Sequence, residues 1–221
     1  KLSSTESRVF ISGPAGSGKE LVARQIHKQS SRSKKPFVVV NGALLDPQKY
    51  ELELFGSENK NETVNYGFFE KAKDGTLLID EISEIPLETQ AKILRVLIDQ
   101  KFKRVNGSKE INVSVRIIST SSKNIREEID KGNFREDLYH RLNVVPIYIP
   151  ALRDRLEDIP LLLNYFSKKI AELNGMNETK LDTNLDLFYK YKWPGNVREL
   201  RNLVERISIL SINENSNNIN Q

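Results

Sequence analysis

A glycine-rich stretch near the start of the chain, GPAGSGKE at positions 13–20, has the residue types of a phosphate-binding loop. Its glycines reach backbone angles that are closed to other residues, so consecutive N–H groups can point at one anion. A lysine would then supply a mobile cation for the terminal phosphates. The usual pattern ends in Ser or Thr, whose hydroxyl binds Mg²⁺, whereas here the last residue is Glu. The residues that we predict to bind a nucleotide are Gly13, Pro14, Ala15, Gly16, Ser17, Gly18, Lys19 and Glu20.

Two adjacent carboxylates, Asp80 and Glu81, end the apolar segment TLLIDE. A buried strand seldom ends in two acids without a reason, because removing carboxylates from water is costly. Beside a phosphate loop, Asp80 would bind or orient Mg²⁺ and its waters, and Glu81 would polarise the attacking water. The alternative is a strand end that simply emerges into solvent. The loop upstream favours the metal-binding and water-activating roles.

Arg135 and Arg141 lie six residues apart in the stretch GNFREDLYHRLNV. An arginine at such a position can reach a γ-phosphate in a neighbouring subunit and stabilise the charge of the transition state. The residues by themselves favour a plainer interpretation, in which these arginines form salt bridges with Glu136 and Asp137 on a helix surface.

A fourth element, WPGNVREL at positions 193–200, predicts the start of a helix. The spacing of Asn196 and Glu199 is that of a capping box, so we expect the helix to begin at Val197. Arg198 then lies in the first turn, where the helix dipole disfavours a cation. Either a bound phosphate or screening by solvent would compensate its charge.

Five apolar segments predict the strands that position these residues, and helical segments alternate with them. The helix that begins at Lys19 would place Leu21, Val22 and Ile26 on its apolar face, and the helix at 88–100 would use Ile93, Leu94, Leu97 and Ile98. Strands that are apolar throughout indicate an α/β fold, a parallel sheet with helices on both faces. The expected strands are 8–13, 36–42, 76–81, 115–122 and 143–150.

Beyond about residue 150 the chain reads as helical, with no further strand. We therefore divide it into an α/β nucleotide-binding core at 1–151, a small all-helical lid at 152–212 and a polar linker or tail at 213–221. The length of 221 residues suits one substantial α/β domain with a small satellite.

The composition argues against several classes of protein and of binding site. The 34 basic and 30 acidic residues give a net charge of only +4, which argues against a dedicated nucleic-acid binder. Without cysteine, disulfides and thiolate metal sites are excluded, and the two histidines, His27 and His140, are too far apart to suggest a metal site. No apolar run approaches the ~20 residues that span a bilayer, and no signal peptide is visible. Both ends read as cut linkers, which suggests a fragment of a longer protein.

Taken in order, these elements resemble the AAA+ ATPase domain of bacterial enhancer-binding proteins, the activators of sigma-54 RNA polymerase. The resemblance covers the chain from about Val9 to Leu210. That family also writes Glu after the loop lysine, which accounts for Glu20; Mg²⁺ would then be held mainly by phosphates, water and the Asp80 side chain. Other shared stretches are ELFG, GTLLIDEI, FREDLYHRL, LRDRLEDIP and WPGNVREL.

The resemblance implies a P-loop AAA+ core with a helical lid, which binds ATP or ADP with Mg²⁺ in the cytoplasm and hydrolyses ATP. It implies a homo-oligomeric ring, hexamer-like in the full protein, in which Arg135 and Arg141 act across the subunit boundary. Arg198 would be the second sensor, and Asn41 would hold Glu81 in check. A sensor kinase and promoter DNA would be partners through domains outside this chain, and no membrane partner is implied.

Two departures from the family pattern bear on function. Activators of this family carry a GAFTGA loop that contacts sigma-54, but residues 57–72 here are short, polar and Asn-rich. The chain therefore lacks such a loop, which argues against a contact with sigma-54. In this shortened segment it resembles response regulators of the NtrX type. The first sensor, usually Thr-Asn, is Ser121-Ser122, and we expect the shorter Ser122 to contact nucleotide with weaker coupling.

Three functions remain open from the sequence. The first is an ATPase whose ring assembly and hydrolysis drive a transcriptional output of a two-component system. The second is a nucleotide-gated oligomerisation scaffold with little or no turnover, whose output depends on a separate DNA-binding domain. The third is another AAA+ machine, such as a clamp-loader-like ATPase, against which Glu20 and WPGNVREL argue.

Overall fold

The computed structural model describes residues 5–46, 48–59, 64–175, 177 and 185–217, and only the backbone of 185 and 211–217. These residues form two compact units. The first contains the chain up to Gly13 together with Lys19–Tyr148, and the second contains Pro14–Gly18 together with the chain from Ile149 onwards. The helical part thus begins three residues before the predicted position 152, and it includes five residues of the glycine-rich loop.

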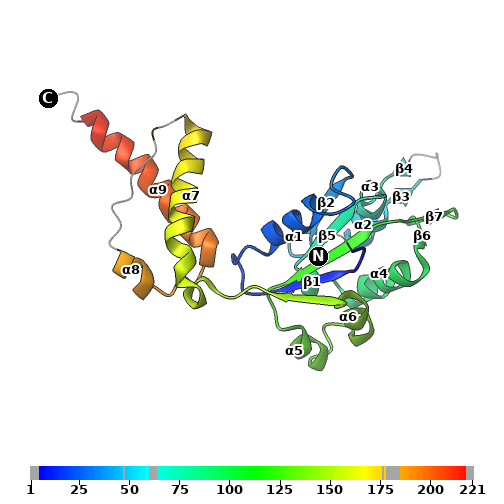
Figure 1. The fold of residues 1–221 in the computed structure, drawn as a ribbon. Coiled ribbons are helices and arrows are strands. Elements are labelled where there is room, and N and C mark those ends of the chain that lie inside the picture. The colour runs from blue at the N-terminus through cyan, green and yellow to red at the C-terminus, as the bar shows by residue number, and fades with distance from the viewer. Residues whose placement is uncertain (1–4, 47, 60–63, 176, 178–184, 218–221) are drawn as a thin grey trace. The chain divides into compact units, whose positions relative to one another are not determined.

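The first unit is built on a five-stranded parallel sheet in the order β2-β5-β8-β1-β9 (Figure 1). All five predicted strands are present, and the α/β fold class is confirmed. Because the strands are parallel, their carboxyl ends share one edge of the sheet, where polar side chains from distant segments meet. The strands are β1 (Val9–Ser12), β2 (Phe37–Asn41), β5 (Thr76–Asp80), β8 (Arg116–Ser121) and β9 (Val145–Tyr148).

Helices cover both faces of the sheet. Helix α1 (Lys19–Lys28) lies on one face, and His27 of this helix contacts Thr76 of β5. Helices α4 (Leu87–Asp99) and α6 (Glu136–Leu142) cover the other face, where the main hydrophobic core lies. The alternation of side chains along each buried strand explains why both faces need cover.

The two predicted helix faces are only partly right. Leu21 and Ile98 are exposed, whereas Ala23 and Val96 are buried. The buried face of each helix is displaced by about one residue from the predicted face, because packing against the sheet determines which side chains are buried. Ile26, Ile93 and Leu97 are buried as expected.

The sequence did not predict two short hairpins, because strands of two or three residues are too short to show an alternation of apolar and polar side chains. They are β3–β4 (Ser57–Glu58, Val64–Asn65) and β6–β7 (Lys101–Lys103, Glu110–Asn112). Arg104 joins them: its guanidinium makes two hydrogen bonds to Glu70, at 2.9 and 2.7 Å, and lies 3.6 Å from Glu58. The segment that lacks the GAFTGA sequence is therefore fastened at its base to the neighbouring hairpin. Four further short elements complete this unit: α2 (Tyr50–Phe55), α3 (Phe68–Lys71), α5 (Ile125–Asp130) and the 3₁₀ helix η2 (Ile82–Glu84).

The second unit is helical in its described part. Its core packs α7 against α9 around Trp193, Leu163 and Leu200. The backbone of α9 continues to Asn217, into the segment predicted to be a polar tail, because extending a formed helix costs far less than starting one. The elements are η3 (Leu152–Asp154), η4 (Leu156–Asp158), α7 (Ile159–Asn174), α8 (Leu185–Lys190) and α9 (Asn196–Asn217).

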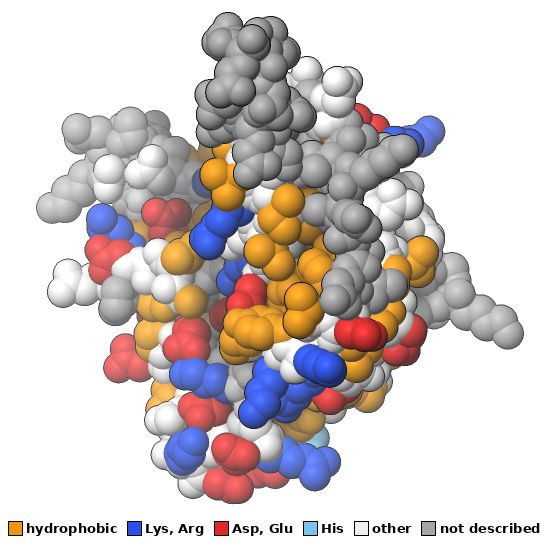
Figure 2. All heavy atoms as spheres, turned by 90° about the vertical axis from the view of Figure 1, so that its left-hand side faces the viewer, with side chains coloured by type: hydrophobic (Ala, Val, Ile, Leu, Met, Phe, Trp, Pro, Cys, Tyr) orange, Lys and Arg blue, Asp and Glu red, His pale blue; other side chains and the backbone are white. Residues whose placement is uncertain are grey.

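Figure 2 shows hydrophobic side chains at the surface, next to basic and acidic ones. The helical unit contributes Leu161, Tyr165 and Leu187, each more than half exposed. Among the described helices, none is both long and apolar enough to cross a membrane.

Candidate functional site

The glycine-rich loop joins β1 to α1 and has the backbone of an anion-binding turn. Gly16 and Gly18 have φ angles of 75° and 106°, which side chains rarely allow. A Cβ atom at Gly16 would lie 2.3 Å from the carbonyl oxygen of Gly195, so only glycine fits there. The Ser17 hydroxyl is buried and has no hydrogen-bond partner in the described part of the chain. A buried donor without a partner is costly, and a phosphate oxygen would satisfy it.

Lys19 occupies the first position of α1 and is only 6% exposed. Its ammonium group donates to the carbonyl oxygen of Gly13 at 2.9 Å and lies 3.3 Å from Oε1 of Glu81. A buried ammonium requires such partners, because desolvation penalises its charge. The buried loop lysine and the partly buried acid that is predicted to activate water therefore form an ion pair.

The two acids lie at the carboxyl edge of the sheet, among polar side chains from the strands on either side. Asp80 Oδ1 accepts from the Thr120 hydroxyl at 2.5 Å, and Asp80 Oδ2 accepts from the Asn41 amide at 2.9 Å. Glu81 Oε2 accepts from both the backbone N–H and the hydroxyl of Ser122, at 2.8 and 2.7 Å. Adjacent parallel strands β2, β5 and β8 thus supply a connected network.

Asn41 therefore has a different partner from the one that the resemblance implies. It contacts Asp80 and makes no hydrogen bond to Glu81. The physical reason is the register: Asn41 and Asp80 are directly paired across β2 and β5. Glu81 follows with a left-handed backbone, φ 52°, which turns its side chain away from β2 and towards β8.

The environment of Glu81 keeps it ionised. Burial by itself would raise the pKa of this carboxyl group, but hydrogen bonds from Ser122 and the charge of Lys19 outweigh it, so the pKa is lowered overall. An ionised Glu81 can accept a hydrogen bond from water, as the predicted role requires.

A magnesium ion fits the donor chemistry of Asp80. Carboxylate oxygens are ligands that Mg²⁺ prefers, and each oxygen of Asp80 keeps a lone pair beyond its one hydrogen bond. Among the residues that the structure describes, no group of three or more acidic, histidine or cysteine side chains could hold a metal by itself. A bound Mg²⁺ would therefore take most of its ligands from phosphate and water.

Glu20, in the place of the usual hydroxyl, pairs with Arg24 one turn along α1, at 2.6 Å. Both side chains are about half exposed. The ion pair gives Glu20 a partner on its own helix, and its predicted contact with nucleotide stays a prediction.

Within the helical unit, three residues contact the backbone of the loop. The N–H of Arg198 donates to Gly16 at 3.3 Å, the amide of Asn196 donates to Ala15 at 2.9 Å, and the guanidinium of Arg155 donates to Ser17 at 2.6 Å. The sequence analysis named Asn196 and Arg198 for other roles and missed Arg155, although LRDRLEDIP contains it. These contacts hold the carbonyl oxygens of Ala15, Gly16 and Ser17.

The predicted capping box is wrong in its details. Helix α9 begins at Asn196, whose side-chain oxygen accepts from the N–H of Leu152 at 2.8 Å. Glu199 accepts from the N–H of Gly195 at 2.9 Å, one residue earlier than a capping box requires. Asn196 has φ 52°, and this left-handed turn shifts the donor that Glu199 can reach.

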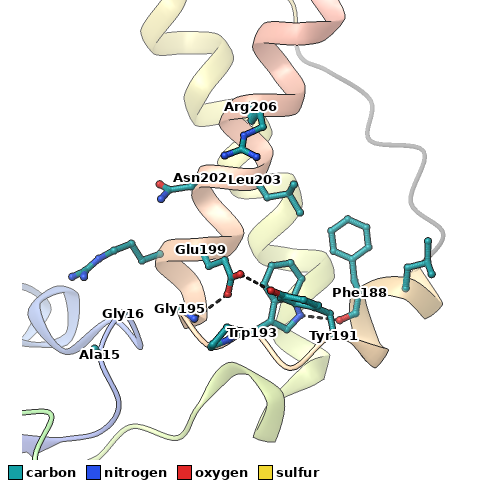
Figure 3. A pocket seen from close by; sticks show the side chains of 13 residues that line it. Ala15, Gly16, Phe188, Tyr191, Trp193, Gly195, Glu199, Asn202, Leu203 and Arg206 are labelled. Atoms are coloured by element: carbon teal, nitrogen blue, oxygen red, sulfur yellow. Dashed lines mark hydrogen bonds between the residues drawn. The ribbon is translucent and has the colours of Figure 1, made fainter.

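A pocket of about 840 Å³ opens beside these residues in the helical unit (Figure 3). Aromatic side chains form one wall: Tyr191 packs edge-on against Trp193, whose ring stacks with Phe188. Glu199 accepts from the Tyr191 hydroxyl at 2.8 Å and so orders this wall. The pocket also includes Gly16 of the loop and Arg198, so it borders the residues predicted to bind phosphate.

The two predicted trans-acting arginines have separate partners within the chain. Arg135, just before α6, binds Asp137 through two hydrogen bonds, at 3.0 and 2.7 Å. Arg141, in the last turn of α6, donates to the carbonyl oxygen of Leu97 at 3.4 Å. Their described hydrogen bonds therefore do not include Asp80 or Glu81, and the salt bridge of Arg135 with Asp137 agrees with the plainer interpretation of the sequence.

Sequence reasoning also missed Thr120. Its hydroxyl donates to Asp80 and accepts from the N–H of Glu81 at 3.0 Å, so one side chain orients both acids. The signal was present in the alternation of RIISTSS, where residues 120 and 122 share one side of a strand.

Comparison with known proteins gives consistent matches. Residues 1–148 match the model of the Sigma-54 interaction domain, and residues 153–220 match that of an AAA+ ATPase lid domain. The nitrogen assimilation regulatory protein NtrX of Azorhizobium caulinodans is 47% identical over 213 residues, which are 96% of this chain and 47% of that protein. The chain thus spans about half the length of the curated relatives that it matches.

Solved structures give the same picture. The crystal structure of NtrX from Brucella abortus in complex with ATP is 50% identical, with a TM-score of 0.89, over 95% of this chain and 49% of that one. The complex of the same protein with ADP has a TM-score of 0.90, over 96% of this chain and 48% of that one.

Proposed function

Because the chain belongs to the Sigma-54 interaction family of AAA+ ATPase domains, we propose that it binds and hydrolyses ATP as the central domain of a transcriptional response regulator. The observation that carries the proposal is the cluster in which the buried Lys19 meets Glu81 beside Asp80. Relatives of NtrX type that bind ATP and ADP support the choice of nucleotide.

In this proposal each residue has one task. The loop N–H groups and Lys19 bind the phosphates, and the Ser17 hydroxyl finds its missing partner there. Glu81 accepts a hydrogen bond from the attacking water, while Thr120 and Ser122 keep both acids in place. Mg²⁺, held from the protein side by Asp80, would neutralise developing phosphate charge.

Hydrolysis in this proposal requires assembly, because the described hydrogen bonds of Arg135 and Arg141 do not include the acids of their own chain. They would stabilise the transition state on a neighbouring copy, in a hexamer-like ring. A sensor kinase and promoter DNA would act through other parts of the full protein, and the short β3–β4 hairpin argues against contact with sigma-54. The protein would act in the cytoplasm.

The test is steady-state ATP hydrolysis at increasing protein concentration, for the parent chain, Arg135→Ala and, as a control, Arg126→Ala. Arg126 is an exposed arginine on α5 without a proposed role. We expect activity per molecule to rise with concentration for the parent and the control, and to fall by about 10³-fold or more for Arg135→Ala.

The alternative function, a nucleotide-gated scaffold, predicts nucleotide binding and assembly without turnover. Parent protein that binds ATP but releases no phosphate at any concentration would decide for the scaffold. Equal activity of Arg135→Ala and the parent would reject the role of this arginine.

A further inference from the structure

Glu81 is held by one residue at two points. The N–H and the hydroxyl of Ser122 both donate to the same oxygen, Oε2, while Oε1 faces the ammonium group of Lys19 at 3.3 Å. The two carboxylate oxygens therefore have different partners. One is bound by a neighbouring strand, and the other by the loop lysine.

Asn41 makes its described side-chain hydrogen bonds to other groups than Glu81. Its side-chain oxygen accepts from the N–H of Ala43 at 2.9 Å, which fixes the amide and points its NH₂ group at Asp80. Hydrogen bonds to an ionised partner are among the stronger ones, so the pairing with Asp80 competes well with any other. The described hydrogen bonds of the Asn41 side chain thus go to Asp80 and to the backbone of Ala43, and none goes to Glu81.

The backbone conformation supports the pairing of Asn41 with Asp80 and of Ser122 with Glu81. Glu81 adopts a left-handed conformation, and its N–H donates to the Thr120 hydroxyl, so its carboxylate is directed to the end of β8. Ser122 follows Thr120 at a spacing of two and meets that carboxylate there. A serine suffices because its backbone and side-chain donors converge on one oxygen.

We propose that Ser122 is the positioning residue of Glu81 in this chain, and that Asn41 positions Asp80 instead. The inference rests on the proposed function for its catalytic meaning. When Lys19 turns to a phosphate, Oε1 of Glu81 loses its partner while Ser122 keeps Oε2 fixed. Oε1 is then the oxygen that accepts a hydrogen bond from the attacking water.

The first readout is kinetic. For Ser122→Ala we expect kcat for ATP to fall about tenfold, equivalent to about 1.4 kcal/mol, with KM changed less than about twofold. The loss stays moderate because the backbone N–H of residue 122 remains. Ser122→Thr restores the hydroxyl and should recover kcat to within about threefold of the parent. Arg126→Gln, at an exposed residue of α5 outside the site, is the control.

The second readout does not depend on turnover. In crystals without nucleotide, we expect the Glu81 carboxylate to move in Ser122→Ala and to stay in place in Asn41→Ala. Unchanged kcat and an unmoved Glu81 in Ser122→Ala would overturn the inference, as would a Glu81 that moves only in Asn41→Ala. Absence of turnover in the parent would instead reject the proposed ATPase, and the crystal comparison would still decide which residue holds Glu81.

Discussion

At the scale of single residues, the ion pair between Arg135 and Asp137 leads to a quantitative prediction. Asp137 binds the guanidinium of Arg135 through two hydrogen bonds, and both side chains are about half exposed. The pairing lowers the pKa of Asp137 and raises that of Arg135, because each favours the charged form of the other. An arginine that is to act on a neighbouring copy must first leave this partner.

We predict that Asp137→Asn promotes assembly-dependent hydrolysis. The asparagine keeps the oxygen that accepts from the N–H of Leu138, but it lacks the charge that holds Arg135. Exposed ion pairs are weak, so we expect the protein concentration that gives half-maximal ATPase activity to fall by about two- to fivefold. The measurement is hydrolysis per molecule across a dilution series.

Glu136→Gln provides the matched control. Glu136 precedes Asp137 on α6, is exposed and pairs with His140 at 3.6 Å rather than with an arginine. It should leave the half-maximal concentration unchanged. An equal shift in both variants would mean that the net charge of α6, and not the release of Arg135, sets the effect.

At the scale of elements, α1 is fixed to the sheet through a buried histidine. His27 is 5% exposed, contacts the Thr76 hydroxyl at 2.9 Å and packs against the ring of Phe37. Burial, and then the nearby charge of Arg116, lower the pKa of His27, although a hydrogen bond with the backbone of Lys35 acts in the opposite direction. Protonation of His27 therefore opposes the packing of α1.

The sign of the pH dependence follows. The unfolded chain has an ordinary histidine pKa of about 6.5, above the folded value, so the unfolded state binds more protons. The contribution of neutral, buried His27 to the stability of the folded state is present above pH ~6.5 and is lost as the pH falls through the lowered folded pKa. We predict that His27→Gln makes the free energy of unfolding less dependent on pH below ~6.5, as measured by urea denaturation.

His140 supplies the comparison, since it is the other histidine and lies exposed on α6. His140→Gln should keep the pH dependence of the parent. If both substitutions reduced the pH dependence of the free energy of unfolding equally, the buried position of His27 would not be the cause of that dependence.

At the scale of the whole molecule, Arg198 tests what the helical unit contributes to nucleotide binding. It lies in the first turn of α9, where the helix dipole disfavours a cation, and its N–H binds Gly16 of the loop. We predict that Arg198→Ala raises the stability of the nucleotide-free protein by about 0.5 kcal/mol but reduces the melting-temperature increase produced by ATP. Thermal unfolding with and without ATP measures both effects.

Arg206→Ala is the control, because Arg206 is on the same helix two turns further on and lines the same pocket. It should leave the effect of ATP on the melting temperature unchanged. A decrease of that effect in Arg206→Ala but not in Arg198→Ala would place the phosphate partner elsewhere on α9.

Much of this molecule could be predicted from its sequence. Five apolar strands, a glycine-rich loop and the acids at positions 80 and 81 are local signals, because strand propensity, backbone freedom and residue order belong to short segments. Glycines and a lysine between a strand and a helix indicate phosphate binding on the same grounds. The short hairpins and the displacement of the buried faces of α1 and α4 were missed, since packing against the rest of the chain determines them.

The sequence by itself determined which chemical groups this protein has and in what order its strands carry them. The pairing of Arg135 with Asp137, two residues apart, was already expected from the sequence. Only the tertiary structure decided the partners of the polar groups at the sheet edge: Asn41 with Asp80, and Ser122 with Glu81. The reason is that a hydrogen bond depends on distances of a few tenths of an ångström. Such distances follow from strand register and from one left-handed residue at position 81, which no local pattern specifies.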